Sequence, residues 1–359
     1  MYTITIDNTK GINHLEFQMP ENQGVYLLTG ENGSGKTTLM VAINRMGNPT
    51  ALTSLKVGRH MPNTYAIDTY NNSKITYSNG AETVTYTRQD VRWVPRPRSN
   101  SKLLDNFPYH NRMTFITTSG MRFYTQDFDT INSHEVLNDA SQNMKESLNS
   151  IFQTNKFNNL KYVTIRNMHG RQKSLHRNNK LYLINEGPGR KYSEQNFSLG
   201  ERLVLNVLDD VETLGDNSML LVDEIELALH PIAQVKFYDL LSRLANEHHL
   251  IVIISTHSVS LINHASNILY LKKEDNGNIN VLKDCRPAYI LKNIGSEQDI
   301  KPDFVFFVED KMARLYLTPI LRRLIATTSL PINYQVVPVG GYEQFHDLGI
   351  LLYRHCRVV

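Results

Sequence analysis

The chain has 359 residues, of which 41% are hydrophobic and 20% are charged, and its formal net charge is +3. This composition is ordinary for a globular protein of about two domains, and with so small a net charge any nucleic-acid contact would have to come from local patches. Its two cysteines give neither a disulfide framework nor a metal-ligand spacing, so we expect a protein of the reducing cytoplasm. No apolar run approaches the roughly 20 residues that span a bilayer, so we expect no membrane contact.

The first 48 residues are predicted to hold two strands, a glycine-rich loop and a helix. Alternation in Met1–Asp7 is typical of a strand, and the apolar run Val25–Leu28 predicts a buried strand that leads into the loop. Thr37–Ile43 is predicted as the helix that follows. The loop between them fits the phosphate-loop pattern G-x-x-x-x-G-K-[ST] without a mismatch, as Gly30-Glu31-Asn32-Gly33-Ser34-Gly35-Lys36-Thr37.

Each residue type in this loop suits the binding of a triphosphate. The glycines let the backbone fold tightly, so that its N–H groups and the positive end of the helix face phosphate oxygens. Lys36 is expected to reach the β and γ phosphates, and the Thr37 hydroxyl to bind Mg²⁺. A glycine-rich turn that matches by chance is the alternative, which the flanking strand and helix disfavour. The sequence therefore predicts ATP and Mg²⁺ as ligands and an ATP site made of Gly30, Glu31, Asn32, Gly33, Ser34, Gly35, Lys36, Thr37 and Thr38.

A polar segment from about residue 50 to 190 is predicted to be a mixed α+β insertion. Strands are expected at Lys74–Tyr77 and Thr83–Thr87, a helix at Asp139–Phe152, and paired strands at Lys161–Ile165 and Leu181–Ile184. Two basic runs, Lys156–Lys191 and Arg88–Arg112, the second with interleaved aromatic side chains, favour nucleic-acid contact, although a solvated charged face or an acidic protein partner stays open. The candidate contacts are Arg96, Arg98, Arg166, Arg171, Lys173 and Arg177, with Trp93 and Tyr109 as aromatic neighbours.

Regular structure is predicted again from Ser198 onward. The apolar run Met219–Val222 predicts a strand, Pro231–Glu247 a helix with proline in its first turn, and Leu250–Ile254 a second strand. A hairpin is expected from Ile268 to Lys283, turning at Asn276-Gly277. The alternation of strands and helices predicts an α/β fold of the P-loop NTPase type.

Two carboxylates end the strand at Met219–Val222. Asp223 is expected to hold Mg²⁺ through water, and Glu224 to orient and deprotonate the attacking water, because in-line phosphoryl transfer needs both a charge clamp and a positioned nucleophile. A strand that ends in ordinary exposed acids is the alternative. His257 follows the second strand in Ile254-Ser255-Thr256-His257-Ser258, and its resemblance to the His at this place in ABC-type ATPases implies a γ-phosphate sensor, although a lone His at a strand end is more often a polar surface residue.

Ser198-Leu199-Gly200-Glu201 lies about 25 residues before Asp223. Ser198 and Glu201 form a capping box, which starts a helix, and a capped helix start is also an anion site. The stretch resembles the signature motif of ABC-type ATPases, in which the Ser hydroxyl and the Gly amide contact the γ-phosphate bound by the opposite subunit. The resemblance therefore implies ATP contacts in trans from Ser198 and Gly200.

The four motifs together resemble the branch of ABC-type ATPases that contains OLD (overcoming lysogenization defect), RecF and SMC proteins. The resemblance covers about residues 1–48 and 195–275, and it places a loop that contacts a second subunit at Glu226–His230. It implies Lys36, Glu224 and His257 as catalytic residues in a homodimer or higher homo-oligomer. It also implies a Gln near Mg²⁺ and the attacking water. Gln126 is a candidate for that role, with a surface-loop Gln as the alternative.

The tail resembles the opening of a TOPRIM domain. Phe304–Val308 is predicted as a strand that delivers Glu309 to a divalent-metal site, followed by a helix at Lys311–Ala326 and a strand at Tyr334–Val339. Asp310 stands where TOPRIM domains usually have Gly, and an ordinary acid at a helix start is the alternative role for Glu309. We predict an ATPase domain over residues 1–300 and the start of a truncated TOPRIM-like domain over 301–359, so that nuclease activity is expected only in a longer chain.

The resemblance implies an ATP-hydrolysing protein that dimerises head-to-tail around ATP and controls a nuclease or another effector in bacterial anti-phage defence. A DNA-binding clamp like RecF or SMC proteins, without nuclease activity, is the alternative. The lack of a long heptad run disfavours SMC, and a TOPRIM-like tail is superfluous in RecF. A transporter ATPase is a third possibility, which the long polar insertion disfavours.

Overall fold

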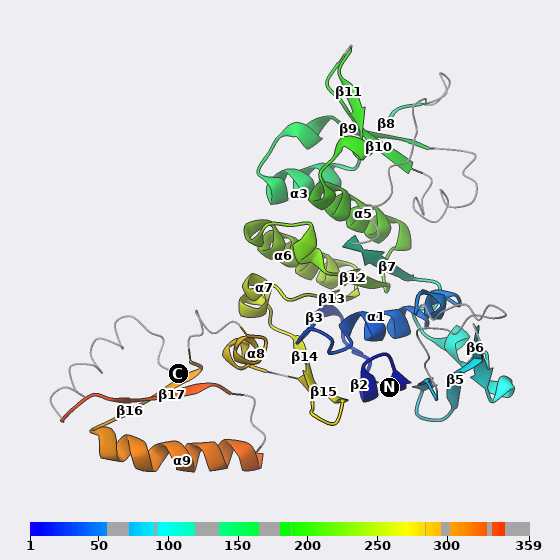
Figure 1. The fold of residues 1–359 in the computed structure, drawn as a ribbon. Helices are drawn as coiled ribbons and strands as arrows, with labels where there is room; N and C mark the ends of the chain where they lie inside the picture. Colours follow the sequence, from blue (N-terminus) through cyan, green and yellow to red (C-terminus); the bar gives the residue numbers. More distant parts are fainter. Residues whose placement is uncertain are drawn as a thin grey trace, which may run out of the picture. The chain divides into compact units, whose positions relative to one another are not determined.

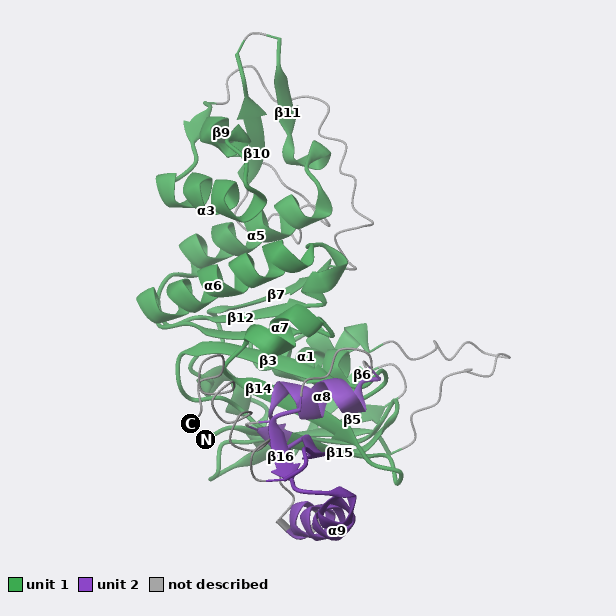
Figure 2. Ribbon diagram, turned by 90° about the vertical axis from the view of Figure 1, so that its left-hand side faces the viewer, with its two compact units in different colours: residues 1–281 green, residues 282–359 purple. Residues whose placement is uncertain are grey.

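The computed structural model describes residues 1–55, 72–89, 92–118, 136–164, 180–187, 189–283, 285–295, 302–328 and 332–341. The chain divides into two compact units, Met1–Val281 and Leu282–Val359 (Figure 2). The candidate Gln126 and the candidate nucleic-acid contacts Arg166, Arg171, Lys173 and Arg177 lie outside the described residues. In the described part of the chain, no helix combines the length and the apolar character needed to cross a membrane.

The first unit is built around a sheet of eleven described strands. Five parallel neighbours form one end of the sheet, and an antiparallel group forms the other (Figure 1). In spatial order the strands are β6 (Arg92–Arg96), β5 (Thr83–Gln89), β4 (Lys74–Ser78), β1 (Thr3–Thr9), β2 (Ile12–Gln18), β15 (Asn278–Lys283), β14 (Ile268–Lys273), β3 (Gly24–Gly30), β13 (Ile251–Ser255), β12 (Met219–Asp223) and β7 (Met113–Thr117).

The parallel end is covered on both faces by helices. Helix α1 (Lys36–Asn44) lies on one face, whereas α5 (Leu199–Leu214) and α6 (Pro231–Glu247) lie on the other (Figures 1 and 2). Every residue of β12 and β13 is buried, which explains their uninterrupted apolar sequences. The predicted α/β fold is confirmed, and the carboxyl ends of β3, β12 and β13 lie at one edge of the sheet.

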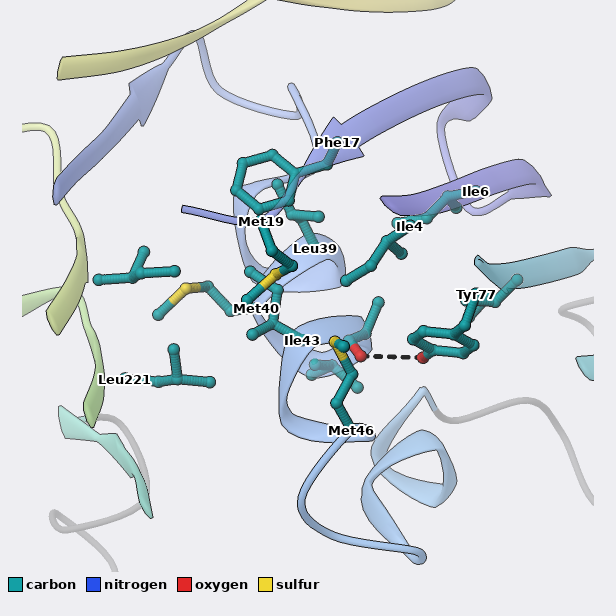
Figure 3. Close-up of a cluster of buried hydrophobic side chains, with 14 of the residues drawn as sticks. Ile4, Ile6, Phe17, Met19, Leu39, Met40, Ile43, Met46, Tyr77 and Leu221 are labelled. Carbon is teal, nitrogen blue, oxygen red and sulfur yellow. Dashed lines mark hydrogen bonds between the residues drawn. The ribbon is translucent and has the colours of Figure 1, made fainter. Parts of the chain in front are cut away.

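The core of this unit holds α1 in place. Leu39, Met40 and Ile43 of α1 pack against Ile4 and Phe17 of the antiparallel strands (Figure 3). The Tyr77 hydroxyl, from β4, donates a hydrogen bond of 2.8 Å to the main-chain carbonyl of Ala42. The helix that begins at the glycine-rich loop is thus anchored by strands of the antiparallel end of the sheet.

The first 48 residues contain three strands rather than the predicted two. The strand that was not predicted is β2, in which Ile12, Leu15 and Phe17 are buried and the other residues are exposed. Two consecutive polar residues, Asn13 and His14, break the strict alternation that marks a half-buried strand. Pairing with β1, which supplies six partner positions, stabilises it.

The predicted insertion contributes both to this sheet and to a smaller one. Strands β4 to β7 join the main sheet, while β8 (Asn138–Asp139), β9 (Leu160–Thr164), β10 (Lys180–Asn185) and β11 (Lys191–Ser193) form a four-stranded sheet beside α3 (Gln142–Phe152). Several cations counted as a basic run have acidic partners in the chain, so these do not form an unopposed basic surface: Lys156 with Glu201, Lys161 with Asp139, Lys180 with Asp209 and Arg190 with Glu186.

The second unit contains the strand–helix–strand pattern predicted for the tail. Strands β16 (Phe304–Val308) and β17 (Tyr334–Pro338) pair in parallel, and α8 (Pro287–Asn293) and α9 (Lys311–Thr328) are its helices. Glu309 follows β16 directly, and its carbonyl accepts a hydrogen bond of 2.8 Å from the Gly340 amide. Asp310 accepts a hydrogen bond of 2.7 Å from the Ala313 amide at the start of α9, so its carboxylate supports the helix. Among the described residues, no three His, Cys, Asp or Glu side chains gather as a metal site.

Candidate nucleotide-binding site

The glycine-rich loop connects β3 to α1, as predicted. Lys36 is the first residue of α1, and its ammonium donates hydrogen bonds of 2.9 Å to the Gly30 carbonyl and 3.0 Å to the Glu31 carbonyl. These bonds draw the side chain across the loop, where it is 7% exposed. Burial lowers the pKa of Lys36 to about 8, and four nearby carboxylates oppose that change. The Lys36 ammonium is therefore held by carbonyls of the same loop that is predicted to bind phosphate.

The residues of this loop fit a phosphate group. The Ser34 hydroxyl is fully buried and has no hydrogen-bond partner among the described residues, so it keeps a donor for a ligand. Gly35 adopts a left-handed φ of 87°, and a Cβ there would lie 2.6 Å from the Ile12 side chain. Only glycine suits this position, where the loop turns into the helix. A buried unpaired donor beside a helix N-terminus is an arrangement that an anion satisfies.

Asp223 lies at the carboxyl end of β12, beside the start of α1. Its side chain is 4% exposed and accepts a hydrogen bond from the Ser255 hydroxyl. Burial raises the pKa of the Asp223 carboxyl, and hydrogen bonds from Ser255 and Thr37 act in the opposite direction. The structure thus brings together Thr37 and Asp223, the two residues predicted to bind Mg²⁺, and oxygen ligands of this kind suit that ion.

Glu224 occupies a strained backbone position next to Asp223. Its φ of 55° and ψ of 54° are left-handed, which is uncommon for a residue other than glycine. Two hydrogen bonds hold this conformation: its amide donates to the Ser255 carbonyl at 2.9 Å, and the buried Thr118 hydroxyl donates to its carbonyl at 2.9 Å. The surrounding structure therefore fixes the backbone from which the predicted catalytic carboxylate extends.

His257 lies at the same edge of the sheet, after β13. Burial, together with the nearby Lys36 ammonium, lowers the pKa of the His257 imidazole, and the charge of Glu226 acts in the opposite direction. The imidazole is therefore held in its neutral form at neutral pH, in which one ring nitrogen donates and the other accepts a hydrogen bond. Lys36, Asp223, Glu224 and His257, predicted from separate motifs, meet in one place.

The sequence did not identify the structural role of Glu226. Its carboxylate accepts a hydrogen bond of 2.6 Å from the Thr256 hydroxyl and one of 2.8 Å from the His257 amide. It lies in the 3₁₀ turn Ile225–Leu227 that follows Glu224. No motif spacing predicts this contact, because the partners are 30 and 31 residues away in the chain. The signal available was that a third acid follows two functional ones.

Ser198 begins α5 and forms the predicted capping box with Glu201. The Ser198 amide donates to the Glu201 carboxylate at 2.9 Å, and the Glu201 amide donates to the Ser198 hydroxyl at 3.3 Å. A Cβ at Gly200 would lie 2.5 Å from the Ala228 carbonyl, so only glycine lets α5 approach the loop after Glu224 this closely. Ser198 itself is exposed and makes no hydrogen bond to the phosphate loop among the described residues.

Glu194 is a buried carboxyl just before this helix. Burial raises its pKa from an ordinary value of 4.5 to about 8, although the Tyr182 amide donates a hydrogen bond to it. The folded protein therefore keeps this group protonated at pH values at which the unfolded chain ionises it. The resulting stability is fully present below pH 4.5 and is lost as the pH rises through about 8.

Replacing Glu194 by Gln is therefore expected to stabilise the protein increasingly as the pH rises. Gln resembles the protonated carboxyl and does not titrate, so the difference in unfolding free energy should grow by about 1.4 kcal/mol per pH unit between pH 5.5 and 7.5. Thermal or urea unfolding of both proteins across this range measures it. A constant difference would show that Glu194 has an ordinary pKa in the folded state.

The described candidates for nucleic-acid contact lie at the opposite end of the main sheet. Arg96 ends the edge strand β6, Arg98 follows it, and both side chains are exposed. Trp93 and Tyr109, which were expected to offer rings for base stacking, instead pack against the core that holds α1. Their apolar surface stabilises the fold, so the aromatic part of the nucleic-acid hypothesis has no support here.

Comparison with known proteins gives one family and several distant folds. Residues 82–263, just over half of the chain, match the family described as "AAA domain, putative AbiEii toxin, Type IV TA system". No curated protein sequence matches significantly. Among solved structures, the chain is similar to the SMC head domain from Thermotoga maritima, with 13% identity, a TM-score of 0.44 and coverage of 78% of this chain and 97% of that one.

Two further solved structures are similar at the same low level. One is an SMC head domain bound to the C-terminal domain of ScpA derived from Pyrococcus furiosus, with 12% identity, a TM-score of 0.47 and coverage of 79% of this chain and 96% of that one. The other is an ATP-binding cassette of an ABC transporter in its ADP conformation, with 14% identity, a TM-score of 0.35 and coverage of 84% and 97%.

Proposed function

This chain belongs to the AAA-domain family just described, and on that premise we propose that it binds ATP with Mg²⁺ and hydrolyses it. The observation that carries the proposal is the convergence of Lys36, Thr37, Asp223, Glu224 and His257 at one edge of the parallel sheet. Phosphoryl transfer to water is served by groups of these kinds: a phosphate-binding cation, oxygen ligands for a divalent ion, a carboxylate and a neutral imidazole.

Each residue has a distinct part in the proposed reaction. Lys36 leaves the Gly30 and Glu31 carbonyls and binds the β and γ phosphates, while the Ser34 hydroxyl and the loop amides hold phosphate oxygens. Glu224 orients a water molecule and accepts its proton, and the neutral His257 hydrogen-bonds the γ-phosphate. Thr37 and Asp223 hold Mg²⁺, which when bound neutralises charge on the phosphate oxygens.

We further propose that two copies pair head-to-tail around ATP, as part of the same function. Ser198 is an exposed, capped helix start that does not contact its own phosphate loop, so it is free to meet a triphosphate held by a second copy. Exposed apolar side chains support a protein contact beside the site: Leu227 is 42% exposed, Ile232 68% and Val259 38%. All three follow the strands that carry Asp223 and Ser255.

Replacing Lys36 by Ala tests the binding part of this proposal. Loss of charged hydrogen bonds to phosphate, each worth about 1.5–3 kcal/mol, should weaken ATP binding by about 10- to 100-fold. Titration with a fluorescent ATP analogue measures the affinity. Lys74→Ala removes an exposed lysine from β4 and should leave the affinity unchanged. Equal affinities in the Lys36 variant and the unaltered protein would refute the proposed ATP site.

Control of a nuclease or another effector, in anti-phage defence, is the proposed output of this ATPase. The tail resembles a TOPRIM opening, and Glu309 directly follows a parallel strand, which is the placement such a domain gives its metal-binding Glu. In this proposal, closure of the ATP-bound pair is the signal that the effector receives. Nuclease chemistry would require acidic residues additional to Glu309.

A nucleic-acid clamp without cleavage is the second candidate function. It is favoured by a cavity of about 470 Å³ in the second unit, lined by Lys292, Arg314 and Arg322 with no acidic residue among its lining. Three cations around one cavity favour an anionic ligand such as a phosphodiester. Binding of an added oligonucleotide, weakened in Arg314→Ala, would support the clamp, and failure of the chain to bind one would contradict it.

A further inference from the structure

Glu226 joins the loop after β12 to the segment after β13. One carboxylate oxygen accepts the His257 amide at 2.8 Å, and the other accepts the Thr256 hydroxyl at 2.6 Å. Thr256 is fully buried, so this anchor point has little freedom to move. The carboxylate therefore fixes the main chain from which the His257 imidazole extends.

The charge of Glu226 also acts on two residues of the candidate site. Of the four carboxylates that stabilise the Lys36 ammonium, Glu226 contributes most, ahead of Asp223 and Glu224. The same carboxylate also favours the charged form of His257. One side chain thus acts on both the phosphate-binding cation and the imidazole, although its own hydrogen bonds go to the protein.

Gln234 makes a second connection between the same two segments. Its amide nitrogen donates to the Leu229 carbonyl at 2.7 Å, and its amide oxygen accepts the Ser258 hydroxyl. Gln234 is 3% exposed, so this connection is buried. Residues 226–229 and 256–258 are therefore tied at two points, which holds the segment that carries His257 in place.

We propose that Glu226 is a positioning residue that fixes His257 through its two hydrogen bonds and so sets the rate of hydrolysis. This inference rests on the proposed function, because it requires an ATP-hydrolysing protein. Glu226 acts through the position of His257 and makes no contact with the phosphates. Its removal is therefore expected to reduce turnover and to retain ATP binding, because three other carboxylates still stabilise the Lys36 ammonium.

A double-mutant cycle in the full chain tests this directly. Glu226→Ala should lower kcat by about 100-fold, the order expected for a misplaced catalytic group, with an unchanged affinity for a fluorescent ATP analogue. Because the effect runs through His257, the variant with both Glu226→Ala and His257→Ala should be no slower than His257→Ala alone. Glu247→Ala, an exposed acid at the far end of α6, is the matched control and should retain full activity.

Glu226→Gln separates position from charge. Its amide oxygen can still accept the His257 amide, and its NH₂ group can donate to the Thr256 hydroxyl. This variant should therefore recover most of the turnover lost in Glu226→Ala. Failure of Gln to restore any activity, or multiplicative losses in the double variant, would overturn the positioning role.

Amide hydrogen exchange provides a readout that is independent of turnover. Protection of the His257 amide should fall in Glu226→Ala and remain in Glu247→Ala, because only the first removes its acceptor. Unchanged protection would overturn the inference even if ATP is hydrolysed. An unaltered chain that binds ATP without hydrolysing it would defeat the proposed function instead, and the exchange result would still decide whether Glu226 holds His257.

Discussion

Glu224→Gln is expected to abolish ATP turnover, preserve ATP binding and accumulate an ATP-bound dimer. Gln keeps the size of the side chain but cannot accept a proton from water, and loss of a general base typically costs 10²–10⁴ in rate. The backbone should be unaffected, because the hydrogen bonds that hold its left-handed conformation come from Thr118 and Ser255 and involve only main-chain atoms of Glu224. Phosphate release measures turnover, and light scattering measures pairing.

Two observations would contradict this expectation. Full hydrolysis by Glu224→Gln would remove Glu224 from the reaction, and loss of turnover with no accumulated dimer would remove the link between hydrolysis and separation. Glu247→Gln is the control, because it makes the same chemical change at an exposed site near the end of α6. It should hydrolyse ATP at the rate of the unaltered chain.

Ser198→Arg is expected to block ATP-driven pairing without preventing ATP binding. The substitution puts a long cation at the exposed helix start that would face the triphosphate of the other copy. It also removes the hydroxyl cap, which costs about 1 kcal/mol and is too little to unfold a domain of this size. Light scattering with and without ATP measures the pairing.

Ser141→Arg provides the matched control for this variant. Ser141 caps α3 through the Met144 amide in the same way that Ser198 caps α5, but it lies in the inserted region. Both variants lose one cap and gain one cation, and Ser141→Arg also loses the hydrogen bond that Ser141 donates to Glu212. Loss of pairing in Ser198→Arg alone would therefore be due to the location of Ser198 and not to the lost cap. ATP-driven pairing that persists in Ser198→Arg would defeat the head-to-tail arrangement.

The local chemistry of the site could be predicted from the sequence because each motif is short and continuous. The conformation of each motif is determined by its own residues, as in the glycine-rich loop, the acids after β12 and the capping box at Ser198. Parallel strands then bring their carboxyl ends together, so motifs far apart in the chain meet at one edge of the sheet.

Contacts between distant segments could not be predicted in this way. Glu226 looked like one more acid after a functional pair, and only the fold reveals that it bonds to Thr256 and His257. Lys156 belonged to a basic run in the sequence, yet it pairs with Glu201 at 2.6 Å. Trp93 appeared available for stacking but packs on the core. In each case the contacting residues are distant in the chain, so no local sequence pattern predicts the contact.

In the proposed dimer, the site around a triphosphate on the phosphate loop of one copy is completed by Ser198 of the other. A structure of the Glu224→Gln protein with ATP and Mg²⁺ bound would decide this. We expect two copies, with the Ser198 hydroxyl of each within hydrogen-bond distance of the γ-phosphate on the loop of its partner. A nucleotide-bound structure in which Ser198 lies far from every γ-phosphate would contradict it.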